Sequence, residues 1–385
     1  CRPAQQRGGV EESRKVDMKK LNVGVIGSGY WGPNLIRNFV SLPESSLAAV
    51  ADLRQDRLAH VKSLYPTVHV TDDYWELFSM NLDAVVVATP PTTHFSIARD
   101  CLQHGLHVLV EKPLALNSRD AEELIEIADR KNLTLMVGHT FEYNPAVREL
   151  RRIISSGELG KIHYLDAVRV NLGLFQPDLN VLWDLAPHDI SILNYILGKE
   201  PLKVSAQGAE CVVPGKHDIA YLNLEFEDNV LAHVRVSWLD PSKVRRITVV
   251  GSKKMVVYDD VEPVEKLKIY DKGVETPSYA DTYHEFQFSY RHGDVVSPAI
   301  RMAEPLKEEC QHFLQSILEE KAPQSDGRVG LKVVRVLEAA ERSLRRGGIP
   351  EFLTWYETAP GSDGRQPDAW QLGEEQVESF ATAEA

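Results

Sequence analysis

From residue 21 to about Gly138, short apolar runs alternate with stretches of helical periodicity, and this alternation limits the possible folds more than any other feature. The apolar runs are NVGVIG, LAAVAD, AVVVATP, HVLVEKP and LTLMVGH. The stretches between them repeat apolar residues every three or four positions, as in SRDAEELIEIADRKN. A series of strand and helix units of this kind predicts a parallel sheet covered by helices on both faces.

The pattern changes after PAVRELRRIISSGELG, in which Gly157 and Gly160 are expected to end a helix. Strand-like segments now follow one another with short turns, and NVLAHVRVSWL alternates apolar with largely polar residues. This alternation predicts a mainly antiparallel sheet whose open face is available to a partner subunit. Two late helices, around EPLKEECQHFLQSILEE and VGLKVVRVLEAAERSLRRGG, complete an α/β fold.

A glycine-rich turn, GVIGSGYWGPN, follows the first predicted strand and opens a helix. Gly27, Gly29 and Gly32 have G-x-G-x-x-G spacing, which serves a tight turn, close approach of the backbone to a pyrophosphate and close packing of helix on strand. Amide groups at the helix start would hold the phosphates. A structural turn is the alternative, but this context predicts a Rossmann dinucleotide-binding domain, with Tyr30 and Trp31 beside the cofactor.

Asp52 ends the second predicted strand, LAAVAD. An acidic side chain there accepts hydrogen bonds from the ribose hydroxyls and repels a 2′-phosphate, so NAD is favoured over NADP. Arg54 and Arg57 oppose this inference, because either could reach a phosphate.

The third strand of the series ends in ATPPTTH, at the carboxyl edge of the sheet, where ligands bind in this architecture. Thr89, Pro90, Pro91 and His94 are therefore candidates for lining the cofactor crevice. For His94, a structural role at a helix start is an equal alternative.

These patterns divide the chain into four parts. We expect residues 1–17 to be a flexible extension, 18–140 the Rossmann NAD-binding domain, 141–356 an α/β domain for substrate binding and oligomerisation, and 357–385 an acidic flexible tail.

Composition excludes several classes of protein. The net charge is −13 without a basic block, which argues against binding to nucleic acid or to an anionic membrane surface. No apolar run approaches the roughly 18 residues of a membrane span. The four cysteines are too widely spaced for a disulfide framework or a zinc site, which fits a cytoplasmic protein.

A catalytic metal is also not expected. The chain has no HExxH, P-loop or GxSxG motif. Several histidines are scattered through sheet and helix segments, as solvent or interface residues are: His217, His233, His284 and His312.

Two short motifs carry further candidate groups. HVLVEKPLAL places Glu111, Lys112 and Pro113 at a strand end on the same rim, although a lysine there is usually a solvated surface charge. WDLAPHD sets Asp184 and His188 four positions apart before an apolar run, and in a helix they would share one face. Asp184 could simply cap that helix, but the proline at position 187 removes one of the backbone donors that a cap would bind.

The chain resembles the Gfo/Idh/MocA oxidoreductases over roughly residues 20–350. The resemblance rests on segments that occur in the family's order: VGVIGSGYWGPN, VADLRQDRLA, VATPPTTH, EKPLAL, GHTFEYNPAV, SGELGKI and WDLAPHDISIL. It implies a Rossmann domain followed by an open-faced α/β domain, assembly as a homodimer or homotetramer, and a cis peptide before Pro113. It also implies that Lys112, Asp184 and His188 meet at the nicotinamide.

These three groups suit hydride transfer from a secondary alcohol. His188 would take the hydroxyl proton, Asp184 would orient His188 and stabilise its cation, and Lys112 would hydrogen-bond the reacting oxygen. Lys112 could be the base instead, if desolvation or a nearby positive charge lowers its pKa.

Within the family, the sequence is most similar to bacterial nucleotide-sugar oxidoreductases such as UDP-N-acetylglucosamine 3-dehydrogenases, which implies a sugar or nucleotide-sugar substrate oxidised at C3. Tyr143, Asn144 and Arg169 are candidate substrate-binding residues, although an arginine on a strand is more often solvated or ion-paired. One alternative is an inositol or free-sugar dehydrogenase. Another is a non-catalytic NAD-binding regulator, against which the retention of the three groups argues.

Overall fold

The computed structural model describes residues 20–275 and 288–355. The predicted extension over 1–17 and the predicted tail over 357–385 lie outside the described residues. The chain separates into two units after Leu353, and the fold below is that of the first unit.

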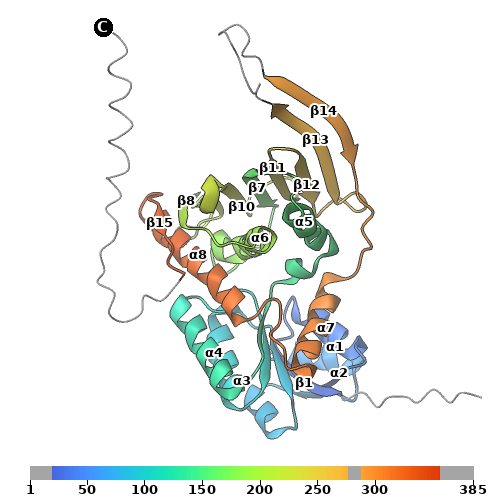
Figure 1. The fold of residues 1–385 in the computed structure, drawn as a ribbon. Coiled ribbons are helices and arrows are strands. Elements are labelled where there is room, and N and C mark those ends of the chain that lie inside the picture. The colour runs from blue at the N-terminus through green and yellow to red at the C-terminus, as the bar shows by residue number, and fades with distance from the viewer. Residues whose placement is uncertain (1–19, 276–287, 356–385) are drawn as a thin grey trace, which may run out of the picture. The chain divides into compact units, whose positions relative to one another are not determined.

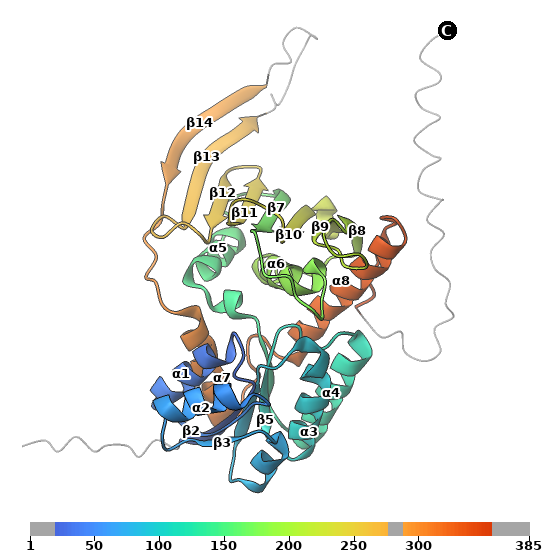
Figure 2. The same ribbon diagram turned by 180° about the vertical axis from the view of Figure 1, so that it is seen from behind.

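The first half of the chain forms a six-stranded parallel sheet with strand order β3-β2-β1-β4-β5-β6. Helices α1 and α2 lie on one side of it and α3 and α4 on the other (Figures 1 and 2). The elements in chain order are β1 (Leu21–Ile26), α1 (Gly32–Ser41), β2 (Ser45–Ala51), α2 (Gln55–Leu64), β3 (His69–Thr71), a 3₁₀ helix η1 (Tyr74–Ser79), β4 (Ala84–Val87), η2 (Pro91–Thr93), α3 (His94–Gln103), β5 (His107–Glu111), α4 (Ser118–Lys131) and β6 (Leu135–Gly138).

The second half forms a mixed sheet of nine described strands with order β14-β13-β12-β11-β7-β10-β9-β8-β15. Its pairs are antiparallel except for β7 and β10, which run parallel at the centre of the sheet, where β7 lies between β11 and β10. The elements are η3 (Thr140–Tyr143), α5 (Pro145–Ser155), β7 (Ile162–Val170), α6 (Val181–Leu197), β8 (Lys203–Ala209), β9 (Ile219–Glu225), η4 (Glu227–Asn229), β10 (Leu231–Ser237), β11 (Val244–Gly251), β12 (Met255–Asp259), β13 (Leu267–Glu275), β14 (Ser289–Val296), α7 (Pro305–Leu318), α8 (Gly327–Arg345) and β15 (Glu351–Phe352).

One face of the second sheet is covered and the other is open, as the alternating pattern predicts. Helices α5, α6 and α8 pack on the covered face. The opposite face exposes Tyr164, Tyr221 and Leu231 on the neighbouring strands β7, β9 and β10. The fold class predicted from the sequence, a Rossmann domain followed by an open-faced α/β domain, is therefore confirmed.

Helix α7 belongs to the Rossmann core, although it falls inside the predicted second domain. Its apolar face, formed by Leu306, Cys310, Phe313 and Leu314, joins one buried cluster with β1 and α1. The rings of Phe39 on α1 and Phe313 on α7 pack edge to face, with centroids 6.4 Å apart. The division at residue 140 thus separates the two sheets but not the residues that cover them.

The segment that connects the two sheets, η3, is held by two residues just before α8, Gln324 and Ser325. The Ser325 hydroxyl donates to the Val137 carbonyl and lies 3.1 Å from the Tyr143 hydroxyl. The Gln324 side-chain amide donates to the main-chain carbonyl of Glu142, whose carboxylate accepts from Ser191 on α6. These contacts hold η3 against α6, where the candidate site lies.

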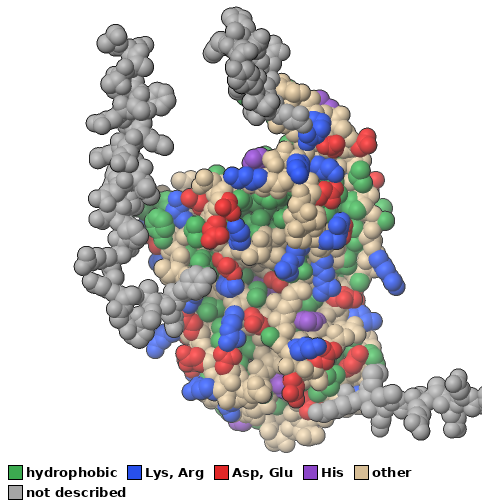
Figure 3. All heavy atoms as spheres, viewed as in Figure 1, with side chains coloured by type: hydrophobic (Ala, Val, Ile, Leu, Met, Phe, Trp, Pro, Cys, Tyr) green, Lys and Arg blue, Asp and Glu red, His purple; other side chains and the backbone are tan. Residues whose placement is uncertain are grey.

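The described part of the chain also bears on the composition arguments. None of its helices is both long enough and apolar enough to cross a membrane. The three cysteines in the described residues are free thiols. On the face drawn in Figure 3, basic and acidic side chains are interspersed over the described surface.

A buried ion pair between β7 and α6 gives a test of the second domain. Arg169 donates from Nε and Nη2 to both carboxylate oxygens of Asp189, at 2.7 and 3.0 Å, and both side chains are almost inaccessible. Asp189→Ala leaves the guanidinium buried without its partner, so we expect it to lower the free energy of unfolding by about 3–5 kcal/mol.

Urea denaturation measures this loss. The matched control is Asp129→Ala, which breaks an exposed pair with Arg328 and should cost less than about 1 kcal/mol. Equal losses in the two variants would contradict a structural role for the buried pair.

Candidate active site

The glycine-rich turn between β1 and α1 has the shape that a dinucleotide requires. Gly27 has φ +99°, and a Cβ on it would lie 2.5 Å from the Ala88 carbonyl oxygen. A Cβ on Gly32 would lie 2.2 Å from the Gly27 oxygen, whereas one on Gly29 would face open space. Gly29 therefore leaves room for a phosphate to approach the backbone. No side chain caps the start of α1, so its amide groups can bind that phosphate.

Asp52 lies directly after β2 and faces this turn. Its carboxylate accepts from the main-chain amides of Ser28, at 2.6 Å, and Arg54, at 2.9 Å. The Arg54 guanidinium is itself paired with Asp56, at 2.7 Å. Because Arg54 already has an acidic partner, the arrangement fits the ribose diol of NAD better than the 2′-phosphate of NADP.

The loop after β4 lies against the glycine turn, since Ala88 and Thr89 are the atoms that a Cβ on Gly27 would meet. Thr89 and Pro91 are partly buried and Pro90 is exposed, so this loop is accessible to a cofactor. His94 is different, because it is 1% exposed and its ring nitrogens lie 2.8 and 2.9 Å from the carbonyls of Pro113 and Thr89. His94 thus connects the loop after β4 to the loop after β5 from the protein interior. It does not line the cofactor crevice, which corrects the expectation from sequence.

Glu111, at the end of β5, packs its carboxyl group over Gly138, where a Cβ would lie 3.1 Å away. Burial raises the pKa of Glu111 to about 7, and the neighbouring Lys112 charge and a hydrogen bond with Trp31 oppose the rise. Tyr30 is 85% exposed and Trp31 37% exposed, so both side chains of the turn are accessible to a cofactor.

Lys112 follows β5 and is joined to Pro113 by a cis peptide bond, as the resemblance implies. Its Nζ donates to the main-chain carbonyl of Asp184, at 2.9 Å, and lies 3.6 Å from the Asp184 carboxylate. Both side chains are 19% exposed. The carboxyl edge of the Rossmann sheet is thereby connected to α6.

The first turns of α6 carry the other two candidates. Asn180 is the N-cap and accepts from the Trp183 amide, so Asp184 does not cap the helix. Asp184 and His188 lie one turn apart on this helix, as predicted.

His188 has surroundings that keep its imidazole neutral. Burial lowers the pKa of His188 well below its ordinary value, and the positive charges of Lys112, Arg169 and Arg245 lower it further. Its Nδ1 is buried without a hydrogen-bond partner among the described residues, and Phe141 packs edge-on at 5.2 Å. Asp184 does not hydrogen-bond to His188 there, which corrects the expectation that it orients the imidazole.

Comparison with known proteins decides the family. Residues 21–139 match the model for the oxidoreductase family with an NAD-binding Rossmann fold, and residues 147–257 match the GFO/IDH/MocA C-terminal domain. The chain belongs to the Gfo/Idh/MocA oxidoreductases. It is a dehydrogenase with an NAD-binding Rossmann domain.

Similar proteins include two curated dehydrogenases. The UDP-N-acetylglucosamine 3-dehydrogenase of Acidithiobacillus ferrooxidans is 29% identical, over 86% of this chain and 100% of the relative. The myo-inositol 2-dehydrogenase of Thermotoga maritima is 26% identical, over 84% of this chain and 96% of the relative. A solved structure of the Acidithiobacillus enzyme has a TM-score of 0.71 at 26% identity, covering 86% of this chain and 99% of that one.

Trp238, directly after β10, is a site residue of this Gfo/Idh/MocA protein that the sequence reasoning missed. Its indole N–H donates to the Asp184 carboxylate at 2.9 Å, and its side chain is 1% exposed. Phe175 packs on the indole with ring centroids 5.1 Å apart, and a Cβ on Gly173 would lie 2.8 Å from it. The alternating pattern of β10 placed Trp238 on the buried face, but only the fold shows that it reaches Asp184.

Tyr143 and Asn144 are structural residues and not the substrate-contacting ones expected from sequence. Tyr143 is fully buried in the Rossmann core cluster. Asn144 caps α5 by accepting from the Ala146 amide, and its side-chain amide donates to the Tyr258 hydroxyl. Neither side chain is available to a ligand.

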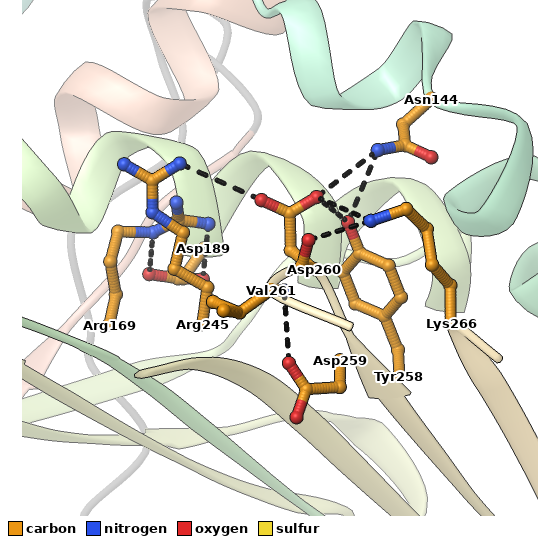
Figure 4. Close-up of polar contacts among 9 residues, drawn as sticks. All are labelled: Asn144, Arg169, Asp189, Arg245, Tyr258, Asp259, Asp260, Val261 and Lys266. Atoms are coloured by element: carbon orange, nitrogen blue, oxygen red, sulfur yellow. Dashed lines mark hydrogen bonds and ion pairs between the residues drawn. The ribbon is translucent and has the colours of Figure 1, made fainter. Parts of the chain in front are cut away.

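Arg169 is likewise occupied. Figure 4 shows its guanidinium against Asp189, and the planar group also lies 4.5 Å over the Phe141 ring. The ion-paired alternative considered from sequence is therefore the one that the structure supports. Arg169 stacks on Phe141, and Phe141 in turn packs against the His188 ring. Arg169 therefore supports the position of His188 and does not present its donors to the substrate.

No group of three or more His, Cys, Asp or Glu side chains suited to a metal ion occurs in residues 20–275 or 288–355.

The contact between Trp238 and Asp184 can be tested with Trp238→Phe, which keeps a buried ring and removes the N–H donor. We expect kcat/KM to fall about 10- to 100-fold, the effect of losing one hydrogen bond to a charged group, while NAD binding stays intact. Steady-state kinetics and NAD titration measure both. Trp183→Phe is the control, because Trp183 is also buried but donates no indole hydrogen bond to the described residues. Equal losses in both variants would mean that ring packing alone matters.

The role of Asp52 can be tested with Asp52→Ala, which removes the acceptor beside the glycine turn. We expect the KM for NAD to rise about tenfold and the preference for NAD over NADP to narrow, because the ribose contact and the repulsion of a 2′-phosphate are both lost. Assays with each cofactor measure the change, and a preference that stays as in the wild type would contradict the assignment.

Proposed function

We propose that this protein oxidises a secondary hydroxyl of a sugar, in particular the C3 hydroxyl of a nucleotide sugar, with NAD as hydride acceptor. The observation that carries the proposal is the contact of Lys112 with Asp184, one helical turn from His188, beside the glycine turn that would hold the dinucleotide.

The glycine turn and Asp52 would bind the cofactor in this proposal. NAD, when bound, accepts the hydride at its nicotinamide ring. Gly27, Gly29, Gly32 and Asp52 would hold its phosphates and adenosine ribose. With the cofactor held in this way, the nicotinamide would lie toward the carboxyl end of β5, which Lys112 directly follows.

Proton transfer is assigned to His188 in this proposal. A neutral imidazole can take the hydroxyl proton as the hydride leaves, and the low pKa of His188 keeps it neutral at physiological pH. The Lys112 ammonium donates to the Asp184 main-chain carbonyl and forms an ion pair with the Asp184 carboxylate, which favours its role as the cation that stabilises the developing negative charge on the oxygen. Asp184 would balance the positive charge of Lys112 and, held by Trp238, fix the position of the Lys112 side chain.

Relatives support a sugar-type substrate. One curated relative is named for UDP-N-acetylglucosamine and another for myo-inositol, at comparable identity, so an inositol or free-sugar dehydrogenase is the second candidate. The retention of Lys112, Asp184 and His188 argues against a non-catalytic regulator.

Two further expectations accompany the activity. The exposed Tyr164, Tyr221 and Leu231 on the open sheet face suit a homodimer or homotetramer, since contiguous apolar groups on a sheet mark protein contacts. A cytoplasmic location, where NAD and sugar nucleotides are found, remains a prediction.

The experiment is reduced-nicotinamide formation with UDP-N-acetylglucosamine, other nucleotide hexoses, free hexoses and myo-inositol, coupled to a step that consumes the ketone and checked by product mass. We expect a two-mass-unit loss from a nucleotide sugar with NAD. His188→Ala and Lys112→Ala should each lower kcat/KM by about 10²- to 10⁴-fold, the usual contribution of acid–base and electrostatic groups.

His60→Ala, which removes an exposed imidazole on α2, is the control and should retain wild-type activity. Turnover confined to free polyols would favour the inositol-dehydrogenase candidate. NAD binding without turnover of any substrate would contradict the proposal and favour the regulator.

A further inference from the structure

Two arginines face each other across neighbouring strands at the active-site end of the second sheet. Arg169 on β7 and Arg245 on β11 are direct cross-strand partners, so their side chains share the covered face. This end of β7 leads into residues 171–175, whose Gly173 amide donates to the Trp238 carbonyl. The pair therefore lies beside the segment that holds Asp184.

The two arginines differ in how their donors are used. Arg169 makes two short hydrogen bonds to Asp189 and is buried. Arg245 is 35% exposed, and among the described residues it forms one ion pair, 3.6 Å long, from Nη1 to the Asp260 carboxylate. Its guanidinium makes no hydrogen bond to the described residues, so the donors on Nε and Nη2, away from the Asp260 ion pair, can bind a ligand.

Asp260 does not depend on Arg245 for its own partners. Its carboxylate accepts from the Tyr258 hydroxyl at 2.9 Å and lies 3.9 Å from the Lys266 ammonium, which also donates to the Asp260 main-chain carbonyl. Figure 4 shows Arg245 reaching Asp260 from one side while Tyr258 and Lys266 approach from the other. Asp260 thus holds Arg245 in place loosely, without occupying both of its donor edges.

The charges of this cluster are not balanced. Among the ion-paired groups, Arg169, Arg245 and Lys266 are cationic and their acidic partners are Asp189 and Asp260, which leaves one positive charge over. Asp259, also drawn in Figure 4, accepts from the Val261 amide and pairs with none of these cations. The whole chain has a net charge of −13, so an anionic substrate needs a local cation of this kind. Arg245 is close enough to His188 for its charge to contribute to lowering the His188 pKa.

We propose that Arg245 is the anchor for a phosphate group of the substrate, bound while the sugar ring lies between Lys112 and His188. This rests on the proposed function and specifies it: the substrate carries a phosphate or diphosphate next to the oxidised sugar. The Nε–Nη2 edge of the Arg245 guanidinium, which has no partner among the described residues, suits bidentate binding to phosphate oxygens. A purely structural pair between β11 and β12 is the competing interpretation.

The test compares Arg245→Gln, Arg245→Lys and Arg246→Gln. Arg246 is the matched control, because it is the next residue of β11, is exposed on the opposite face, and loses the same charge. Binding of UDP is measured by calorimetry with the protein saturated with NAD, so that the dinucleotide site is closed. The KM values for a nucleotide sugar and a free sugar are measured in parallel.

We expect Arg245→Gln to weaken UDP binding about 10- to 100-fold and to raise the KM for the nucleotide sugar relative to that for the free sugar by a similar factor. Arg245→Lys should restore part of the UDP affinity, because lysine keeps the positive charge but lacks the planar guanidinium that binds two phosphate oxygens at once. Arg246→Gln should bind UDP as the wild type does. NAD binding and the thermal midpoint of each variant check that it is folded.

UDP binding that is absent from the wild type, or equal in wild type and Arg245→Gln, would overturn the proposal. Nucleotide-sugar turnover with an unchanged KM in Arg245→Gln would overturn the phosphate anchor while the proposed function stands. Arg245-dependent UDP binding without turnover of any nucleotide sugar would support the phosphate anchor and contradict the proposed function.

Discussion

The contact between Lys112 and Asp184 connects the two halves of the site. Lys112 lies at the carboxyl end of a Rossmann strand and Asp184 on the first turns of α6. Their contact therefore fixes the position of His188, on the same helix, relative to the glycine turn of the Rossmann sheet. A hydrogen bond of 2.9 Å to the main-chain carbonyl fixes the ammonium to the helix itself, and the carboxylate adds a second, weaker attraction. Trp238 holds that carboxylate from the other side.

Much of the fold could be predicted because its signals are local. Strand–helix alternation and the glycine spacing identify the Rossmann sheet, and Gly157, directly after the C-cap of α5, has the positive φ of a residue that ends a helix. Gly160 also has a positive φ, but it lies in the turn that follows and does not end the helix. The sequence analysis missed β3, β14 and β15. Strands β3 and β15 contain only three and two residues, too few for a period of two to be visible. The parallel pairing of β7 with β10 was also missed, because it depends on which strands become neighbours and not on any one segment.

The candidate site was predictable only where a residue's role follows from a motif. Gly27, Gly29, Asp52 and Lys112 lie where their motifs indicate, whereas His94, Tyr143 and Asn144 face inward and serve the scaffold. A sequence shows that a residue is polar, but not whether its donors are already used by neighbours from distant segments. Arg169 and Arg245 illustrate the limit: they are the same residue type on adjacent strands, and only their partners distinguish a buried tie from an accessible cation.

The packing of α7 on α1 has a consequence for how the protein is made. The apolar face of the Rossmann domain that receives Leu306, Phe313 and Leu314 stays uncovered until the ribosome has synthesised those residues, long after the sheet's own strands have emerged. An N-terminal fragment that ended after β6 would present Leu35 and Phe39 to water, where they would favour association with other chains. The first domain therefore reaches its native core only when almost the entire second domain has been translated, which makes the two domains one unit of folding despite their separate sheets.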